Sequence, residues 1–137
     1  MIKWDDSMQT GIPELDVQHR EIIDRFNEFS EAIASSRLSA IDQASEVLDF
    51  LQFYAVWHFE REEECFEQHR CPAAAANKKA HAQFVAMFGE FYEQWQTRGM
   101  NPVLAKETFD ALALWIVNHI RRTDTQLMPC VHRGEQQ

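Results

Sequence analysis

The chain is poor in the residues that interrupt helices. Its 137 residues include only four glycines and four prolines, and no stretch of useful length alternates apolar and polar residues as a strand would. No apolar run approaches the roughly 20 residues that cross a bilayer as a helix. The N-terminus lacks the basic start and apolar stretch of a signal peptide. We therefore expect an all-α protein that does not enter the membrane and resides in the cytoplasm.

Basic residues are also scarce. Lys and Arg total 13 against 22 Asp and Glu, so the formal net charge is −9 and the isoelectric point is near 5.0. Nucleic acids and anionic membranes bind basic surfaces, and this balance argues against both as partners.

Cysteine is limited to Cys65, Cys71 and Cys130, an odd number without a CxxC spacing. Three thiols are too few for the four ligands of an iron–sulfur cluster. We expect reduced thiols in a cytoplasm rather than a disulfide framework. The alternative is a Cys71–Cys130 pair, since each of these residues stands next to a proline.

Apolar residues recur at helical spacing in four segments. The first runs from about Asp16 to Ser35, and the second ends near Gln68. Pro72 opens the third, and the fourth ends at Pro129. Ten Phe and four Trp supply bulky core material. We predict one domain over residues 1–137, built as an antiparallel up-down-up-down four-helix bundle (16–128) between an irregular N-terminal arm (1–15) and a tail (129–137).

Two helix starts carry their own signals. Ser39 followed by Asp42 resembles a capping box at the start of the second helix. Asn101 suits the N-cap of the fourth helix, and Pro102 suits its first helical position.

The apolar face of each predicted helix carries a histidine. These are His19, His58, His81 and His119, and two carboxylates, Glu62 and Asp124, accompany them. A single histidine on such a face is usually a core residue with a hydrogen-bond partner. Four of them would each need a partner, at roughly 1–3 kcal/mol apiece. Metal coordination satisfies all four together, and this mixed nitrogen and oxygen set suits iron, manganese or zinc.

The spacings support a site with two metal ions. His58 and Glu62 lie one turn apart, so both point inward. Asp124 follows His119 by five residues, which separates them by roughly 140° on an ideal helix. That offset suits one residue that caps a metal and one that reaches sideways to bridge. Two carboxylates able to bridge favour a metal pair.

Other chemistries lack their motifs. There is no His-Glu-x-x-His of a zinc protease and no Glu-x-x-His of a ferritin-like di-iron protein. No Ser-His-Asp or Cys-His pairing has a recognisable spacing. Glu63 and Glu64 point off the inner face, and we expect them to form a solvated rim with Arg61.

Several motifs, in order, resemble the bacterial hemerythrins over nearly the whole chain. They are Trp4, Gly11-Ile12, Asp16-x-x-His19, His58-Phe-x-x-Glu62-Glu63, Pro72 ahead of His81, Trp115-Ile-Val-Asn-His119-Ile with Asp124, and Pro129-Cys130. Hemerythrins are four-helix proteins that bind oxygen at a non-heme di-iron centre. The resemblance implies two iron ions, Fe2+ or Fe3+, with an oxo or hydroxo bridge.

The resemblance also implies a role for each site residue. His19 and His58 would bind the iron that accepts O2, His81 and His119 would bind the other iron, and Glu62 and Asp124 would bridge them. Hydrocarbon from Ile22, Phe59, Ile116 and Ile120 would wall the oxygen pocket, besides its ordinary role in core packing. A dry wall limits the access of water and protons.

Asn77 departs from the family pattern, which has a histidine at this position. An amide oxygen is a weaker ligand than imidazole but can coordinate a hard iron. If Asn77 does not bind, water fills the gap and gives a second open position. His69 is poorly placed to substitute, because it precedes Pro72, and His132 is expected to be exposed in the tail.

The resemblance implies reversible O2 binding for storage, delivery or sensing, by a monomer with O2 as its ligand and an unidentified acceptor or signalling partner. The incomplete histidine set supports an alternative, a di-iron enzyme or iron-handling protein acting on peroxide or nitric oxide. A third reading is a purely structural bundle, which the six retained ligand positions disfavour.

Overall fold

The computed structural model describes residues 2–35, 38–98 and 102–135. Its elements, in chain order, are η1 (Asp6–Met8), α1 (Pro13–Ala34), α2 (Leu38–Gln68), α3 (Ala74–Arg98), α4 (Pro102–Arg122), η2 (Asp124–Gln126) and α5 (Leu127–Glu135). Over these ranges the chain forms no strand. The predicted all-α class is confirmed.

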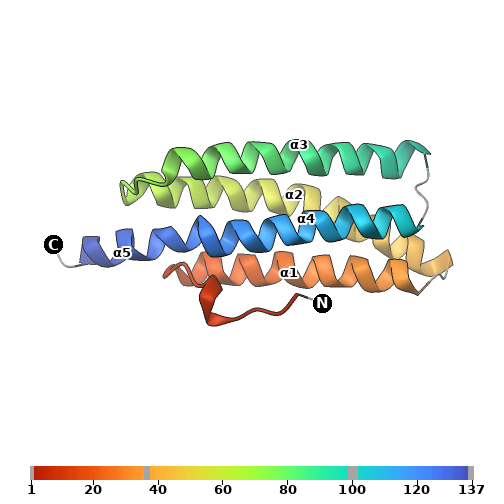
Figure 1. The fold of residues 1–137 in the computed structure, drawn as a ribbon, viewed down its shortest axis with the longest axis horizontal. Helices are drawn as coiled ribbons and strands as arrows, with labels where there is room; N and C mark the ends of the chain where they lie inside the picture. The colour runs from red at the N-terminus through yellow and green to blue at the C-terminus, as the bar shows by residue number, and fades with distance from the viewer. Residues whose placement is uncertain (1, 36–37, 99–101, 136–137) are drawn as a thin grey trace.

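Four long helices lie side by side and alternate in direction along the chain (Figure 1). α1 packs against α2 and α4, and α3 packs against the same two helices. This arrangement confirms the antiparallel up-down-up-down bundle. None of the helices, as far as the structure describes them, is both long enough and apolar enough to cross a membrane.

The start of α1 is fixed by a short turn. Gly11 has φ +87°, in the left-handed region that glycine adopts without strain. Pro13 then occupies the first helical position, where its missing N–H costs no hydrogen bond. The Asp16 carboxylate accepts hydrogen bonds from the backbone N–H and the hydroxyl of Thr10, each at 2.9 Å. The turn therefore sets where α1 begins.

The N-terminal arm lies along α1 (Figure 1). The Asn27 side chain exchanges two hydrogen bonds with the backbone of Ile2, at 3.0 and 2.8 Å. Trp4 is partly buried against the core, with the Arg20 guanidinium 4.8 Å from its ring centre. The arm contains the single turn η1, and α1 begins three residues before the predicted Asp16.

The last helix does not end at Pro129, as the sequence had suggested. α4 stops at Arg122, η2 follows, and α5 continues as far as Glu135. Pro129 is the third residue of α5, within the first turn, where the lack of an N–H is tolerated. Pro72 similarly stands two residues before α3 rather than opening it. Ser39, predicted to cap the second helix, instead lies within α2, which begins one residue earlier at Leu38, and Asn101 lies outside what the structure describes.

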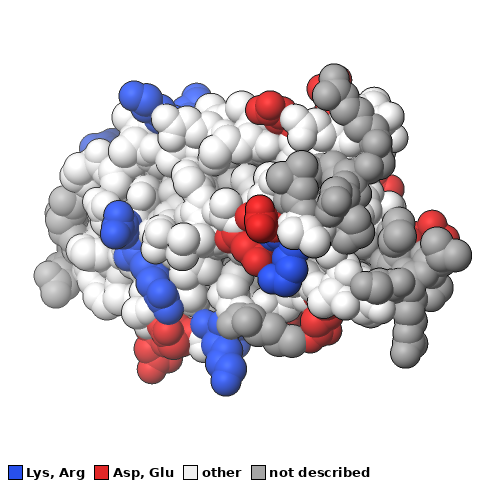
Figure 2. Space-filling model, turned by 45° about the vertical axis from the view of Figure 1, so that its right-hand side comes forward, with Lys and Arg blue, Asp and Glu red and all other residues white. Residues whose placement is uncertain are grey.

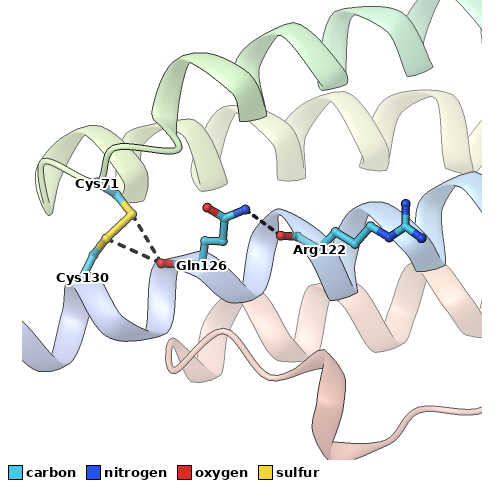
Figure 3. The surroundings of a disulfide bond; sticks show 4 residues. All are labelled: Cys71, Arg122, Gln126 and Cys130. Atoms are coloured by element: carbon cyan, nitrogen blue, oxygen red, sulfur yellow. Dashed lines mark hydrogen bonds between the residues drawn. A yellow bond between two sulfur atoms is a disulfide. The ribbon is translucent and has the colours of Figure 1, made fainter.

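Cys71 and Cys130 form a disulfide, which corrects the expectation of three reduced thiols. Their Cα atoms lie 5.6 Å apart, a usual spacing for this bond, although 59 residues separate them in the sequence. Both sulfurs lie against the Gln126 carbonyl oxygen, at 3.4 and 3.5 Å (Figure 3). The continuation of the chain into α5 brings the two cysteines together. Cys65 remains a free, half-buried thiol.

A polar layer divides the apolar interior into two clusters. The larger cluster includes the stacked rings of Phe26 and Phe109, and the smaller one surrounds Phe66 and the disulfide. On α1, for example, His19 lies between Leu15 of the smaller cluster and Ile22 of the larger one. The bundle therefore holds these polar groups inside a largely apolar interior.

Candidate metal centre

All six predicted ligands come together in the polar layer. His19 is on α1, His58 and Glu62 on α2, His81 on α3, His119 on α4 and Asp124 on η2. Each of them is buried, and Glu62 is fully enclosed. Burial of so many polar groups at one place requires that they interact with one another or with a shared ion.

Glu62 is at the centre of the layer, and its two oxygens face opposite sides. Oε2 lies 2.8 Å from Nε2 of His19 and 3.0 Å from Nε2 of His58. Oε1 lies 2.8 Å from Nε2 of His81 and 4.0 Å from Nε2 of His119. One carboxylate therefore connects two pairs of histidines.

The two carboxylate oxygens of Asp124 also face different histidines. Its Oδ2 lies 3.2 Å from Nε2 of His19, and its Oδ1 lies 3.0 Å from Nε2 of His119. The second pair is close but does not align as a hydrogen bond, so both atoms lack a partner among the described groups. Such buried, unpaired atoms facing each other are the arrangement that a shared cation would satisfy.

A change in the helix brings Asp124 inward. On an ideal helix it would diverge from His119, but α4 ends at Arg122 and the chain tightens into η2. The freed carbonyl of Arg121 accepts a hydrogen bond from the Thr125 hydroxyl at 2.6 Å. The carbonyl of Arg122 accepts one from the Gln126 side chain, also at 2.6 Å (Figure 3). Asp124 therefore faces inward because the backbone changes from α4 to η2, and not because its side chain extends sideways from a regular helix.

Two further side chains, not predicted from the sequence, contact His58 and His81 at Nδ1, the ring nitrogen that does not face Glu62. Gln18 is buried, and its Oε1 lies 2.6 Å from Nδ1 of His58. Glu63, expected on a solvated rim, is partly buried with Oε2 3.4 Å from Nδ1 of His81. Gln18 was detectable, because it lies one turn before Ile22 on the inner stripe. Such partners fix the orientation and the tautomer of a metal-binding histidine.

Aromatic rings stack on the faces of two of the histidines. Phe59 stacks on His81, with ring centres 3.9 Å apart and planes 11° apart. Trp115 stacks on His119, at 5.0 Å and 8°. Phe59, Ile22, Ile116 and Ile120 are all buried in the larger core cluster. Their role as an oxygen pocket remains a prediction. Phe59 stacks on His81, which was expected to bind the iron that does not accept O2.

The electrostatics of the layer favour a cation. Burial by itself lowers the pKa of His19, but hydrogen bonds to Asp124 and Glu62 outweigh it and raise the pKa to about 10. Burial lowers the pKa of His58. Although burial opposes the charge of Glu62, the surrounding histidines hold its pKa well below the usual range. A carboxylate kept ionised among imidazoles is a suitable ligand for a divalent ion.

Asn77 is also in the layer and is fully buried. Its Nδ2 donates a hydrogen bond to Oε1 of Glu62, at 3.2 Å. Its Oδ1 has no partner among the residues described. The structure therefore places Asn77 beside the His81 and His119 group. His132 is exposed, and His69, partly buried just after α2, is not among the clustered groups.

Two sets of these residues are close enough to hold a metal ion each. One comprises His19, His58 and Glu62, and the other comprises Glu62, His81, His119 and Asp124. Within each set the ligand atoms lie within 4.8 Å of one another. Glu62 belongs to both, so the donor set fits a pair of ions bridged by carboxylate.

Comparisons with known proteins agree with this geometry. The model of the hemerythrin HHE cation binding domain matches residues 10–131. A bacteriohemerythrin of Stenotrophomonas maltophilia is 32% identical over 124 residues, which cover 90% of this chain and 77% of that protein. One from Pseudomonas aeruginosa is 30% identical over 131 residues, covering 96% and 82%. A crystal structure of wild-type hemerythrin matches the fold with a TM-score of 0.83 at 24% identity, covering 96% of this chain and 98% of that one. The chain belongs to the hemerythrin family.

Proposed function

We propose that the protein binds O2 reversibly at a non-heme di-iron centre. The observation that carries the proposal is the division of Glu62 and Asp124 between two pairs of histidines. His19 and His58 would hold one iron and His81 and His119 the other, with both carboxylates and an oxo or hydroxo group between them. Bound iron in both positions would supply the electrons for reversible O2 binding.

The surrounding residues suit such a site. Gln18 would orient His58, while Phe59 and Trp115 would hold the rings of His81 and His119. Ile22, Phe59, Ile116 and Ile120 would form an apolar pocket that keeps water and protons from the bound gas. Storage, delivery and sensing are all compatible with these contacts.

Asn77 supports the second candidate function. With one imidazole fewer, the iron of the His81 and His119 group would oxidise or exchange its ligands more readily. That behaviour suits a di-iron enzyme or iron-handling protein acting on peroxide or nitric oxide. The two candidates differ in whether the oxygenated form releases O2 or converts to an oxidised form.

The partner expected for this site is O2, with an acceptor or signalling protein still to be identified. Basic and acidic side chains lie near one another on the face drawn in Figure 2, and with a net charge of −9 the chain does not suit nucleic acid or an anionic membrane. We infer a monomeric single domain over residues 1–137, with an arm at 1–15. A cytoplasmic location remains part of the proposal, and the Cys71–Cys130 disulfide is the observation that speaks against it.

The deciding experiment measures iron content and visible absorption of the same sample when reduced, when oxygenated and after O2 is removed. We expect two iron ions per chain and a charge-transfer band that appears with O2 and disappears without it. A band that persists after O2 is removed would favour the enzyme or iron-handling candidate. A chain that retains no iron would contradict both.

A further inference from the structure

Asn77 stands where the hemerythrin pattern has a histidine ligand. We propose that the metal held by His81 and His119 has a coordination position open to a small exchangeable ligand, namely water or hydroxide, which a small anion can displace. Asn77 forms a hydrogen bond to that ligand and does not bind the metal. The inference rests on the proposed di-iron function and deepens it, because it gives the centre two exchangeable positions, one on each metal.

The ligand count is the first support. Each metal group offers two imidazole nitrogens and shares the carboxylates of Glu62 and Asp124. Non-heme iron sites with two histidines and a carboxylate keep positions open for exogenous ligands. The hemerythrin pattern gives one iron a third histidine and so closes it, whereas here the two groups are alike in nitrogen donors.

The orientation of the Asn77 amide is the second support. Its Nδ2 donates to Oε1 of Glu62, the oxygen that also faces His81. The opposite orientation would set the amide oxygen against a carboxylate oxygen, so this one is chemically fixed. Oδ1 is consequently directed away from Glu62, and within the described parts of the chain no donor reaches it. Asn77 has no exposed surface, so bulk water does not satisfy this oxygen.

A ligand that carries a proton resolves this unpaired atom. A water molecule or hydroxide held on the His81 and His119 metal donates to Oδ1, and a buried acceptor gains the partner that buried acceptors require. A histidine would instead occupy the position with its own nitrogen. The asparagine thus keeps the position open and polar.

The test uses the cobalt(II)-loaded protein, which avoids oxidation, and azide as the probe. Cobalt content is measured first, then azide binding by calorimetry together with the visible spectrum. We expect two cobalt ions and two azide ions per chain. Asn77→His is expected to bind one azide. Asn77→Ala is expected to bind two, one of them about fivefold more tightly, because azide has no proton to donate to Oδ1 and in the wild type must displace a water that has one. Gln83→His adds an imidazole on the exposed face of α3 and is the matched control. It should bind two azide ions, as the wild type does.

The outcomes separate the inference from the function on which it rests. Two cobalt ions with a single azide in the wild type, rising to two azides in Asn77→Ala, would show that the amide oxygen is itself a metal ligand and would overturn the inference alone. Two azides in Asn77→His would overturn it as well. Fewer than two cobalt ions in the wild type would overturn the proposed di-iron centre, and the inference with it. Circular dichroism of each variant confirms that the bundle is intact, and the Asn77→Ala result decides if Asn77→His does not fold.

Discussion

Glu62 and Asp124 each direct one oxygen to His19 and the other away from it, Glu62 toward His81 and His119 and Asp124 toward His119. The closest of these contacts are 2.8 Å from Glu62 to His19 and 3.0 Å from Asp124 to His119. Two carboxylates that divide their oxygens in this way could hold two adjacent metal ions between them. Most of the expected behaviour of this protein depends on this relationship.

Removing the charge of Glu62 should disrupt both metal positions. In Glu62→Gln the side chain keeps its size, but an amide cannot serve as a bridging anion. We expect metal affinity at the centre to fall by about 100-fold or more, because loss of a supporting residue alone already costs 10- to 100-fold. Equilibrium dialysis with cobalt(II) measures it. Glu64→Gln is the control, since Glu64 is exposed and pairs with Arg61. Equal affinities in the two variants would contradict the bridging role.

Metal binding should stabilise the bundle. The buried layer of histidines and carboxylates is satisfied by the ions, so folding and metal binding are linked. With free metal at about 100 times its dissociation constant, the linked stabilisation is about 2.7 kcal/mol, or roughly 10 °C in Tm. Thermal unfolding with cobalt(II), and again after addition of a chelator, measures the shift. A Tm that does not respond to metal would show that this layer is not a metal site.

The identity of residue 77 should control how long the oxygenated protein lasts. We expect Asn77→His to lose bound O2 by oxidation more slowly than the wild type, because a third imidazole closes the position beside Glu62. The decay of the oxygenated absorption band in air gives the rate. Gln83→His is again the control, with an unchanged rate expected. A wild-type rate in Asn77→His would refute the importance of the missing imidazole.

The disulfide should contribute to stability through the segment that carries Asp124. Cys71 precedes α3 and Cys130 is on α5, so the bond closes a long loop. We expect Cys130→Ser to lower the free energy of unfolding by about 3 kcal/mol, measured by urea denaturation. Cys65→Ser removes a thiol that is outside the bridge and should change little. If both variants unfold at the same urea concentration, the bridge does not hold the native protein together.

The sequence by itself determined the bundle and the inward-facing histidines. A helix turns by a fixed angle per residue, so the spacing of apolar residues states which side chains face the core, and His19, His58, His81 and His119 follow from it. Glu62 was equally accessible, because it lies one turn after His58. Asn77 stood out for the same reason, as a residue at an inward position where the family has histidine.

Only the tertiary structure decided which groups meet across the helices and where the helices depart from regularity. The change from α4 to η2 turns Asp124 inward, and a periodicity that assumes one helix cannot describe it. The contact of Gln18 with His58, the contact of Glu63 with His81 and the Cys71–Cys130 bond each join residues distant in the sequence. Such contacts depend on the relative height and rotation of packed helices, which the pattern along any one helix does not specify.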